Sequence, residues 1–294
     1  MHECQFICPS TVAEGIETIS RIDDDVVFIS GGTDLVIRLQ DGQIQPAWLM
    51  DISLIPELKF IQEVDGRLKI GSGTTFTQMG ESDLLSEKAR CLSQAASQVG
   101  SVQIRNRATL GGNIANASPA GDSLPVLLVL EAGVSLMGPK GFRRVSFAQL
   151  QAGEGMGLHA KELITEIDFP IWEPRGRAHI VSAFGKLGSR TEVSIARLNM
   201  AAVVEFDAEE QRILDSRWAV GALGRIPFRL GELEREIKGK TVNQGLAEEV
   251  ADHLTVVVDR AIPGRASQGY KRQAIRGLAY DLLEDLFPKQ ITNR

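Results

Sequence analysis

The chain has 294 residues, of which 43% are hydrophobic and 24% charged, and its formal net charge at pH 7 is -6. This size and hydrophobic content can build one large domain or two to three smaller lobes with buried cores. The negative net charge, without a basic stretch interleaved with aromatic residues, argues against a nucleic-acid partner. Because no apolar run is long enough to cross a bilayer and no secretory signal is visible, we expect no membrane association and a cytoplasmic location.

The cysteines and histidines exclude several kinds of metal site. Only three cysteines, Cys4, Cys8 and Cys91, are present, and no pair has the CxxC spacing. A cluster or zinc site with four thiolate ligands therefore cannot be built within one chain. The four histidines are scattered singly along the sequence. We therefore predict that the chain carries no metal site.

The first predicted elements form a lobe over residues 1–57. In chain order, the apolar spacing predicts a helix over residues 11–22, a fully buried strand over 26–29, a helix over 34–39 and a strand over 48–52. The strand over 26–29 ends at a glycine pair that precedes a helix. A phosphate-binding loop needs this arrangement.

A second lobe is predicted over residues 58–173, and it mixes strands with helices. Its elements are strands over residues 68–71 and 163–170, helices over 75–79 and 84–99, and a hairpin with strands at 134–137 and 142–145. Residues 172–177 are rich in charged residues and turn formers, and we predict that they are a linker.

A third lobe is predicted over residues 178–294. Its strands fall around residues 180–186, 196–206 and 217–222, and helices follow over 243–257 and 270–286. Strands followed by helices indicate an α+β lobe.

Two glycine-centred segments are the most informative feature of the sequence. The first runs from Ile29 to Leu35 around Gly31-Gly32, and the second from Thr109 to Ile114 around Gly111-Gly112. A glycine pair lets bare backbone N–H groups approach a phosphate without an intervening Cβ, and Thr33 and Thr109 can each add a hydroxyl donor. Two such loops predict a dinucleotide whose pyrophosphate is held from two sides. The simpler interpretation of the first pair is a tight turn at the end of a strand.

Asp122 has two possible roles. It is placed to cap a helix over residues 123–130, or its carboxylate could accept a hydrogen bond from a ribityl or ribose hydroxyl. Both roles are compatible. No side chain stands out as a nucleophile or as a general base, so we predict no catalytic residue of those kinds.

These motifs resemble the FAD-binding medium subunit of molybdenum hydroxylases, the family that includes the medium subunits of xanthine dehydrogenase and carbon monoxide dehydrogenase. The resemblance rests on Ser30-Gly31-Gly32-Thr33-Asp34-Leu35, Gln103-Ile104-Arg105-Asn106 leading into Thr109-Leu110-Gly111-Gly112-Asn113, and Ser118-Pro119-Ala120-Gly121-Asp122. It extends through Gly71-Ser72-Gly73-Thr74-Thr75, Ser182-Ala183-Phe184, Lys186, Arg190 and Ile195-Ala196, and covers effectively the whole chain.

The resemblance implies an α+β fold: a two-lobed FAD-binding domain (residues 1–57 and 58–173) followed by a C-terminal α+β domain of the carbon monoxide dehydrogenase flavoprotein type (178–294). The cofactor-binding residues that it implies are Val27, Phe28, Ile29, Ser30, Gly31, Gly32, Thr33, Asp34, Thr109, Gly111, Gly112, Asn113, Asn116 and Asp122, with Leu163 or Ile164 packing near the flavin. Lys186 is either close to the isoalloxazine or the NAD site, or a surface lysine on a strand.

The implied function is electron transfer within a larger complex. Electrons would leave the substrate at a molybdopterin centre in a large partner subunit, cross [2Fe-2S] clusters in a small one, reach FAD in this chain, and pass to NAD+ or another acceptor. The shortage of cysteines agrees with clusters held elsewhere. Two alternatives remain. One is a self-contained FAD-dependent oxidase; such enzymes often hold flavin covalently through His or Cys, and no His or Cys lies beside either glycine segment, so this alternative is disfavoured. The other is a scaffold that has lost flavin.

Overall fold

The computed structural model describes residues 4–153, 157–190, 193–207, 209 and 211–291. The chain forms two compact units that interleave along the sequence. The first unit comprises Met1–Ser82, Ser101–Ala117 and Glu131–Pro170, and the second comprises Asp83–Gly100, Ser118–Leu130 and Ile171–Arg294. Among the described residues, no helix is both long enough and apolar enough to span a membrane.

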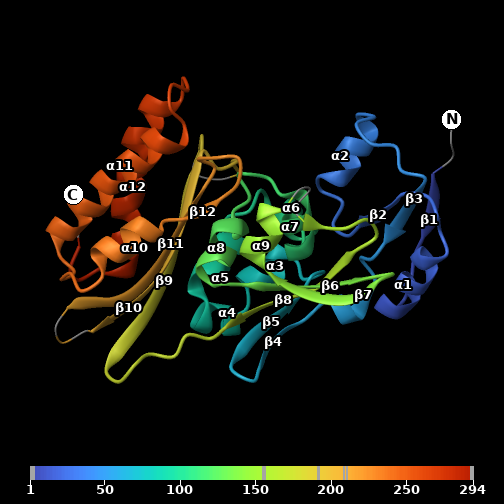
Figure 1. Ribbon diagram of the computed structural model, residues 1–294, viewed down its shortest axis with the longest axis horizontal. Helices are drawn as coiled ribbons and strands as arrows, with labels where there is room; N and C mark the ends of the chain where they lie inside the picture. The colour runs from blue at the N-terminus through green and yellow to red at the C-terminus, as the bar shows by residue number, and fades with distance from the viewer. Residues whose placement is uncertain (1–3, 154–156, 191–192, 208, 210, 292–294) are drawn as a thin grey trace. The chain divides into compact units, whose positions relative to one another are not determined.

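The N-terminal part of the first unit is a parallel sheet of three strands (Figure 1). The strands are β1 (Gln5–Ile7), β2 (Val26–Ile29) and β3 (Trp48–Asp51), in the order β1-β3-β2. Helix α1 (Val12–Ser20) begins at Thr11, whose side chain accepts a hydrogen bond from the Glu14 N–H, and α2 (Leu35–Gln40) follows the first glycine pair. The predicted helices and strands of this region are therefore confirmed.

The prediction that residues 26–29 are fully buried is wrong. All four residues of β2 are partly exposed. The reason is that β2 lies at the edge of the sheet, where only Val26 and Phe28 pack against the small core formed by Ile19, Met50, Ile52 and neighbouring apolar side chains.

The larger sheet of the first unit has five antiparallel strands in the order β4-β5-β8-β6-β7. The strands are β4 (Ile61–Val64), β5 (Arg67–Gly71), β6 (Gly133–Gly138), β7 (Gly141–Ser146) and β8 (Leu163–Pro170). Short helices accompany them: η1 (Pro56–Leu58), α3 (Phe76–Gly80), α6 (Val102–Arg105), α7 (Leu110–Asn116) and α9 (Phe147–Ala152). The predicted hairpin is confirmed as β6 and β7, and Gly141 takes the positive φ of +102° at the turn, which glycine adopts easily.

The second unit is built around a four-stranded antiparallel sheet in the order β12-β11-β10-β9 (Figure 1). Its strands are β9 (Ala178–Leu187), β10 (Leu198–Asp207), β11 (Arg212–Gly221) and β12 (Phe228–Arg229), and its helices are α4 (Asp83–Lys88), α5 (Arg90–Ser97), α8 (Ser123–Val129), α10 (Gly231–Ile237), α11 (Gln244–Ala261) and α12 (Gln268–Leu286). The single helix predicted over residues 84–99 is two helices, because Ala89 leaves the helical conformation (φ -149°, ψ 54°).

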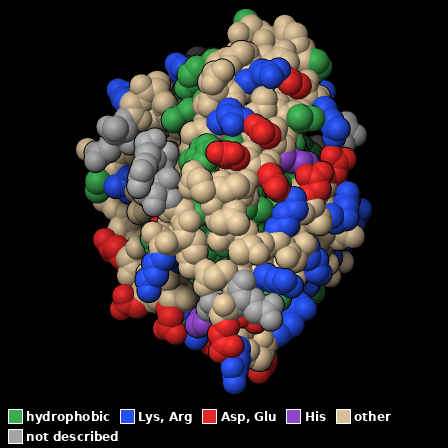
Figure 2. Space-filling model, turned by 90° about the vertical axis from the view of Figure 1, so that its left-hand side faces the viewer, with side chains coloured by type: hydrophobic (Ala, Val, Ile, Leu, Met, Phe, Trp, Pro, Cys, Tyr) green, Lys and Arg blue, Asp and Glu red, His purple; other side chains and the backbone are tan. Residues whose placement is uncertain are grey.

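Helices cover both faces of the four-stranded sheet. On one face, Ala183, Met200 and Trp218 are buried in a core shared with α10, α11 and α12. On the other face, the backbone N–H of Cys91 in α5 donates to the Ser182 hydroxyl, and Asn199 contacts Asp122 at the start of α8. Figure 2 shows acidic and basic side chains interspersed over the side of the molecule where α10 to α12 lie in Figure 1. Exposed ion pairs of this kind, such as Arg272–Asp259, stabilise little.

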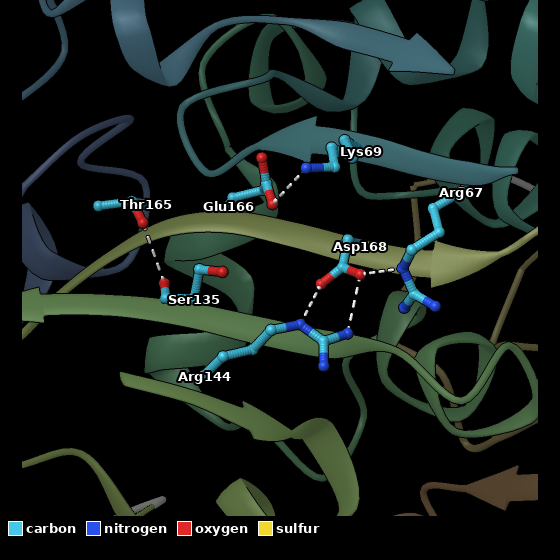
Figure 3. Close-up of polar contacts among 7 residues, drawn as sticks. All are labelled: Arg67, Lys69, Ser135, Arg144, Thr165, Glu166 and Asp168. Atoms are coloured by element: carbon cyan, nitrogen blue, oxygen red, sulfur yellow. Dashed lines mark hydrogen bonds and ion pairs between the residues drawn. The ribbon is translucent and has the colours of Figure 1, made fainter. Parts of the chain in front are cut away.

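Asp168 is the centre of an ionic network on the five-stranded sheet (Figure 3). Its carboxylate accepts two hydrogen bonds of 2.8 Å from the Arg144 guanidinium in β7 and another from Arg67 in β5. Arg144 reaches it across Gly133, where a Cβ would lie 2.1 Å from Nη2 of Arg144. Burial raises the pKa of Asp168, but the hydrogen bonds from the two arginines outweigh burial and hold the pKa below its usual value.

Candidate functional site

The two glycine segments lie against each other in the first unit. A Cβ on Gly31 would be 2.0 Å from the carbonyl oxygen of Arg107, two residues before Thr109. The Asn116 amide at the end of α7 donates a hydrogen bond of 3.0 Å to Asp34, just before α2. Segments about eighty residues apart in the sequence are thus held together by a backbone contact and by a side-chain hydrogen bond.

The first segment presents backbone donors that the described residues do not use. Within the described part of the chain, no acceptor is recorded for the N–H groups of Gly31, Gly32 and Thr33. Gly32 has a φ of +75°, a backbone conformation that residues other than glycine rarely adopt. The Thr33 hydroxyl donates to the Asp34 carboxylate at 3.0 Å. Three successive free N–H groups at such a bend are a donor set that fits an anion.

In the second segment, the expectation of free backbone donors is wrong. The Leu110 N–H donates to the Thr74 carbonyl, the Gly111 N–H donates to the Ser72 carbonyl at 2.8 Å, and the Asn113 N–H donates to the Thr109 carbonyl. The Gly112 N–H donates to the Thr109 hydroxyl at 3.2 Å, so Thr109 is the N-cap of α7. The segment supports its neighbour, while its own main-chain donors are satisfied.

The glycines also have a different explanation from the predicted one. We expected the missing Cβ atoms to make room for a phosphate. Instead, the space beside Gly31 is taken by the Arg107 carbonyl, and a Cβ on Gly111 would lie 2.6 Å from Cβ of Ser72. Of the second pair, only Gly112 is exposed, and a Cβ there would approach just the Thr109 hydroxyl, at 3.0 Å. Gly31 and Gly111 are therefore required by the packing of the protein itself.

The other candidate residues of the first unit surround these segments or lie in its core. Val27, Phe28 and Ile29 belong to β2, and Ser30 follows it; a Cβ on Gly32 would lie 3.5 Å from the Ile29 side chain. Ile164 and Leu163 are buried in β8, with Ile164 paired to Leu136 beside a β-bulge. Asn113 lies in α7 and is partly exposed.

Asp122 and Lys186 belong to the second unit, where they form a buried ion pair. The Lys186 ammonium donates to the Asp122 carboxylate at 2.6 Å and to the Gln98 carbonyl at 2.9 Å. The interpretation of Lys186 as a surface lysine is wrong, since its side chain is only 7% exposed. Asp122 occupies the N-cap position of α8 as predicted, but its side chain makes no capping hydrogen bond. Burial raises the pKa of Asp122, and Lys186 and Asn199 offset only part of this rise.

Asn199 is a member of this cluster that the sequence interpretation missed. Its amide nitrogen donates to Asp122 at 3.0 Å, and its fully buried amide oxygen has no hydrogen-bond partner among the described residues. Gly221 on β11 makes room for that oxygen, because a Cβ there would lie 2.2 Å from it. One signal was available: Asn199 interrupts the apolar run of β10. Ser72, whose buried hydroxyl likewise has no recorded partner, follows a glycine in the sequence and gave a weaker signal.

Metal ligands are not grouped in the described residues. Among these residues, no three His, Cys, Asp or Glu side chains lie close enough together to hold a metal ion. Cys4 and Cys8 are exposed and Cys91 is buried, and all three are free.

The fold has close counterparts among solved structures. Carbon monoxide dehydrogenase from Hydrogenophaga pseudoflava matches with a TM-score of 0.85 and 24% sequence identity, over 97% of this chain and 98% of the matched chain. Quinoline 2-oxidoreductase from Pseudomonas putida 86 matches with a TM-score of 0.82 and 22% identity, over 98% and 96% of the two chains. At these identities the similarity establishes the α+β fold.

Sequence profiles and relatives establish the family. Residues 2–172 match the FAD binding domain in molybdopterin dehydrogenase, and residues 183–286 match the CO dehydrogenase flavoprotein C-terminal domain. The nicotinate dehydrogenase FAD-subunit of Eubacterium barkeri is 31% identical, with 97% of each chain covered. The xanthine dehydrogenase FAD-binding subunit of Escherichia coli O157:H7 is 28% identical over 94% of this chain and 93% of the relative. The chain belongs to the family of FAD-binding subunits of molybdopterin dehydrogenases; it is an oxidoreductase subunit, and FAD is its cofactor.

Proposed function

We propose that the chain is the electron-transfer subunit of a xanthine dehydrogenase-like molybdenum hydroxylase. In this proposal, a molybdopterin-binding large subunit passes electrons to [2Fe-2S] clusters in a small partner subunit, and the clusters pass the electrons to this chain. The chain then delivers them to NAD+ or another acceptor. The observation that carries the proposal is the row of three unused N–H groups in the first glycine segment, in a chain of this family. The count of three cysteines supports clusters in another chain, since a [2Fe-2S] cluster needs four ligands.

We assign the pyrophosphate of FAD to the N–H groups of Gly31, Gly32 and Thr33. The chemistry of these donors fits a diphosphate, and the bend that presents them is held by Arg107 and Asn116. Thr109 and Gly111 would hold that bend from behind, and the exposed side of Gly112 would face the cofactor. The remaining assigned contacts are Val27, Phe28, Ile29, Ser30, Asp34, Asn113, Asn116, Asp122, Ile164 and Lys186.

When bound, FAD supplies the electron-accepting and electron-releasing chemistry of the subunit. The contribution of the chain is to bind and orient this group and to set the charge around it. Lys186 and Asp122 are ordered by each other and by Asn199, so neither side chain has to reorganise when the cofactor arrives. We propose that this pair sets the charge near the flavin.

We also propose that the sequence is organised as two FAD-binding lobes, residues 1–57 and 58–173, and a C-terminal domain, residues 178–294. The grouping of the strands supports this division, because the three sheets use strands from Gln5 to Asp51, from Ile61 to Pro170 and from Ala178 to Arg229. Helices α4, α5 and α8 are the exception, since they pack with the second unit although they precede residue 173.

Purification from the native cell tests the electron-transfer proposal. We expect a yellow protein that elutes with a molybdenum-containing polypeptide and with an iron–sulfur polypeptide, and a flavin that bleaches when the substrate of the complex is added. A flavin-loaded chain that never associates with such polypeptides would rule out the proposal. If the isolated chain then oxidised a substrate, it would be a self-contained oxidase.

The flavin-free scaffold is disfavoured by membership of an FAD-binding family. Absorbance near the flavin bands after gentle purification separates it from the proposed function. A colourless protein that takes up no added FAD would favour the scaffold.

A further inference from the structure

The second unit contains a pocket of about 330 Å³ at the beginning of α12. Its lining includes Pro119, Arg197 just before β10, Ala222 just after β11, and Ser267, Tyr270 and Lys271 around the first turn of α12. We call it the α12 pocket. None of its lining residues is among those assigned above to FAD.

The α12 pocket carries two cations that have no carboxylate partner among the described residues. No ion pair is recorded within the described residues for Arg197 or for Lys271. The Lys271 ammonium donates to the Ala222 carbonyl, and the Arg197 guanidinium lies over the Tyr270 ring, 5.5 Å from its centroid. Burial, and then the positive charge of Arg265, lower the pKa of Lys271. An anion in the pocket would relieve this repulsion.

Further donors come from α12 itself. The N–H groups of Gly269 and Tyr270 have no recorded acceptor among the described residues, as is normal in the first turn of a helix, and the Ser267 side chain does not cap them. Ser267 and Tyr270, whose side chains carry hydroxyls, are exposed residues of the pocket lining. Cations, hydroxyls and N–H groups are thus present, and the described residues that line the pocket include no acidic side chain. This combination favours an anion with several acceptor oxygens.

We propose that the α12 pocket binds a phosphate-bearing ligand in addition to FAD. Arg197 and Lys271 hold the phosphate, and the exposed ring of Tyr270 offers an apolar surface to the organic part of the ligand. Phosphate is favoured over a carboxylate because the donors come from three places in the pocket: from Arg197 just before β10, from the side chain of Lys271, and from the start of α12. This inference does not depend on the electron-transfer proposal.

Calorimetric titration of the FAD-loaded protein tests the proposal, with ADP, inorganic phosphate and adenosine as separate probes. We expect ADP to bind and adenosine to fail, and binding to weaken as salt is raised. If inorganic phosphate competes with ADP and binds as tightly, the site takes free phosphate; if it binds more weakly, the organic part contributes. Either result supports the proposal, whereas no binding by ADP or by phosphate overturns it.

Variants locate the binding in the pocket. Arg197→Gln and Lys271→Gln should each weaken ADP binding about tenfold, because each removes a charged hydrogen-bond donor. Ser267→Asp should abolish binding by placing a carboxylate beside the cations, and it should not unfold the protein, since an acidic residue suits a helix N-terminus. Lys289→Gln is the matched control, because it removes the same charge from an exposed lysine that lies beyond the other end of α12, outside the pocket.

Two further outcomes would contradict the proposal. Equal weakening by Lys289→Gln would mean that ADP responds only to the net charge of the protein. Binding that appears only after FAD has been removed would mean that ADP occupies the cofactor site. In both cases FAD binding and electron transfer would be untouched, so failure of this inference is distinguishable from failure of the proposed function.

Discussion

Gly31 shows how a single residue joins the two glycine segments. Any side chain there would collide with the Arg107 carbonyl, which is backbone and cannot turn away. We expect Gly31→Ala to separate the segments, to destabilise the protein by about 1–3 kcal/mol and to abolish FAD retention. Thermal unfolding and the ratio of flavin to protein absorbance measure the two effects.

Gly112→Ala is the comparison for Gly31→Ala. A Cβ at this exposed position meets only the Thr109 hydroxyl, and alanine suits a helix better than glycine. We expect the melting temperature to change by less than about 3 °C and FAD binding to weaken, because the open side of Gly112 belongs to the proposed site. If Gly31→Ala kept full flavin occupancy, the assignment of the first segment would fail.

Asn199 fixes the orientation of Asp122, and Asn199→Asp tests how far that matters. The variant places a second carboxylate beside a buried one, which should cost about 2–4 kcal/mol of unfolding free energy near neutral pH. The pKa of the pair would be raised in the folded state, so the added destabilisation should grow as pH rises from 5 to 8. Urea unfolding at the two pH values measures it.

Asn199→Ala is the control for this pH dependence. It also removes the hydrogen bond that lowers the pKa of Asp122, but it adds no charge, so its destabilisation should grow less between pH 5 and pH 8 than that of Asn199→Asp. If the two variants lost equal amounts of unfolding free energy at both pH values, the ionisation of Asp122 would not depend on the residue at position 199.

At the scale of single elements, local pattern predicted where helices and strands occur but not how they end or pair. The apolar run of β2 was read correctly as a strand, and its position at a sheet edge was invisible because pairing partners lie elsewhere in the chain. The break at Ala89 was missed because alanine is a strong helix former, and tertiary packing overrides that preference. Caps such as Thr11 were predictable, since they depend on neighbouring residues alone.

The five-stranded sheet depends on the Asp168 network for part of its stability in mild acid. The pKa of Asp168 is lower in the folded state than in the unfolded chain, so its contribution is complete above the usual Asp pKa and is lost as pH falls through the folded value. We expect Asp168→Asn to cost about 1–2 kcal/mol at pH 7, since both arginines are partly exposed, and to flatten the loss of stability below about pH 4.

Glu166→Gln is the matched substitution in the same strand. Glu166 lies 3.7 Å from Lys69, and both side chains are partly exposed, so the effect should stay below about 1 kcal/mol. Chemical denaturation between pH 3 and pH 7 compares the variants. If the free energy of unfolding depended on pH in the same way for Asp168→Asn and for the parent protein, Asp168 would not contribute to the loss of stability in acid.

At the scale of the whole chain, the resemblance to a known family predicted features that hydrophobic patterns alone could not. The family, the cofactor and the class of fold followed from motifs, and the pairing of the two glycine segments was expected from that resemblance. The Asp122–Lys186–Asn199 cluster could not be derived, because its members come from α8, β9 and β10 and meet only in the folded second unit. The membership of α4, α5 and α8 in the second unit was equally hidden, since it depends on contacts distant in sequence.

The interleaving of the units predicts that residues 178–294 do not fold alone. That fragment lacks α5 and α8, which cover one face of its sheet, so Ser182, Asn199 and their apolar neighbours would be exposed. We expect it to aggregate or to bind a hydrophobic dye strongly. The control is the full chain with a protease site inserted at residues 172–177: after cleavage, the two pieces should remain together in size-exclusion chromatography. A well-folded fragment would contradict this.

The same interleaving constrains the order of events at the ribosome. Helix α8 ends at Val129, and the sheet that buries it begins only at Ala178. At roughly 5–20 residues per second, this nearly all-apolar helix leaves the exit tunnel several seconds before its partner strands exist. During that interval it presents an exposed hydrophobic segment of the kind that chaperones recognise. Production of this subunit should therefore be more sensitive to chaperone supply than that of a protein whose domains emerge one after another.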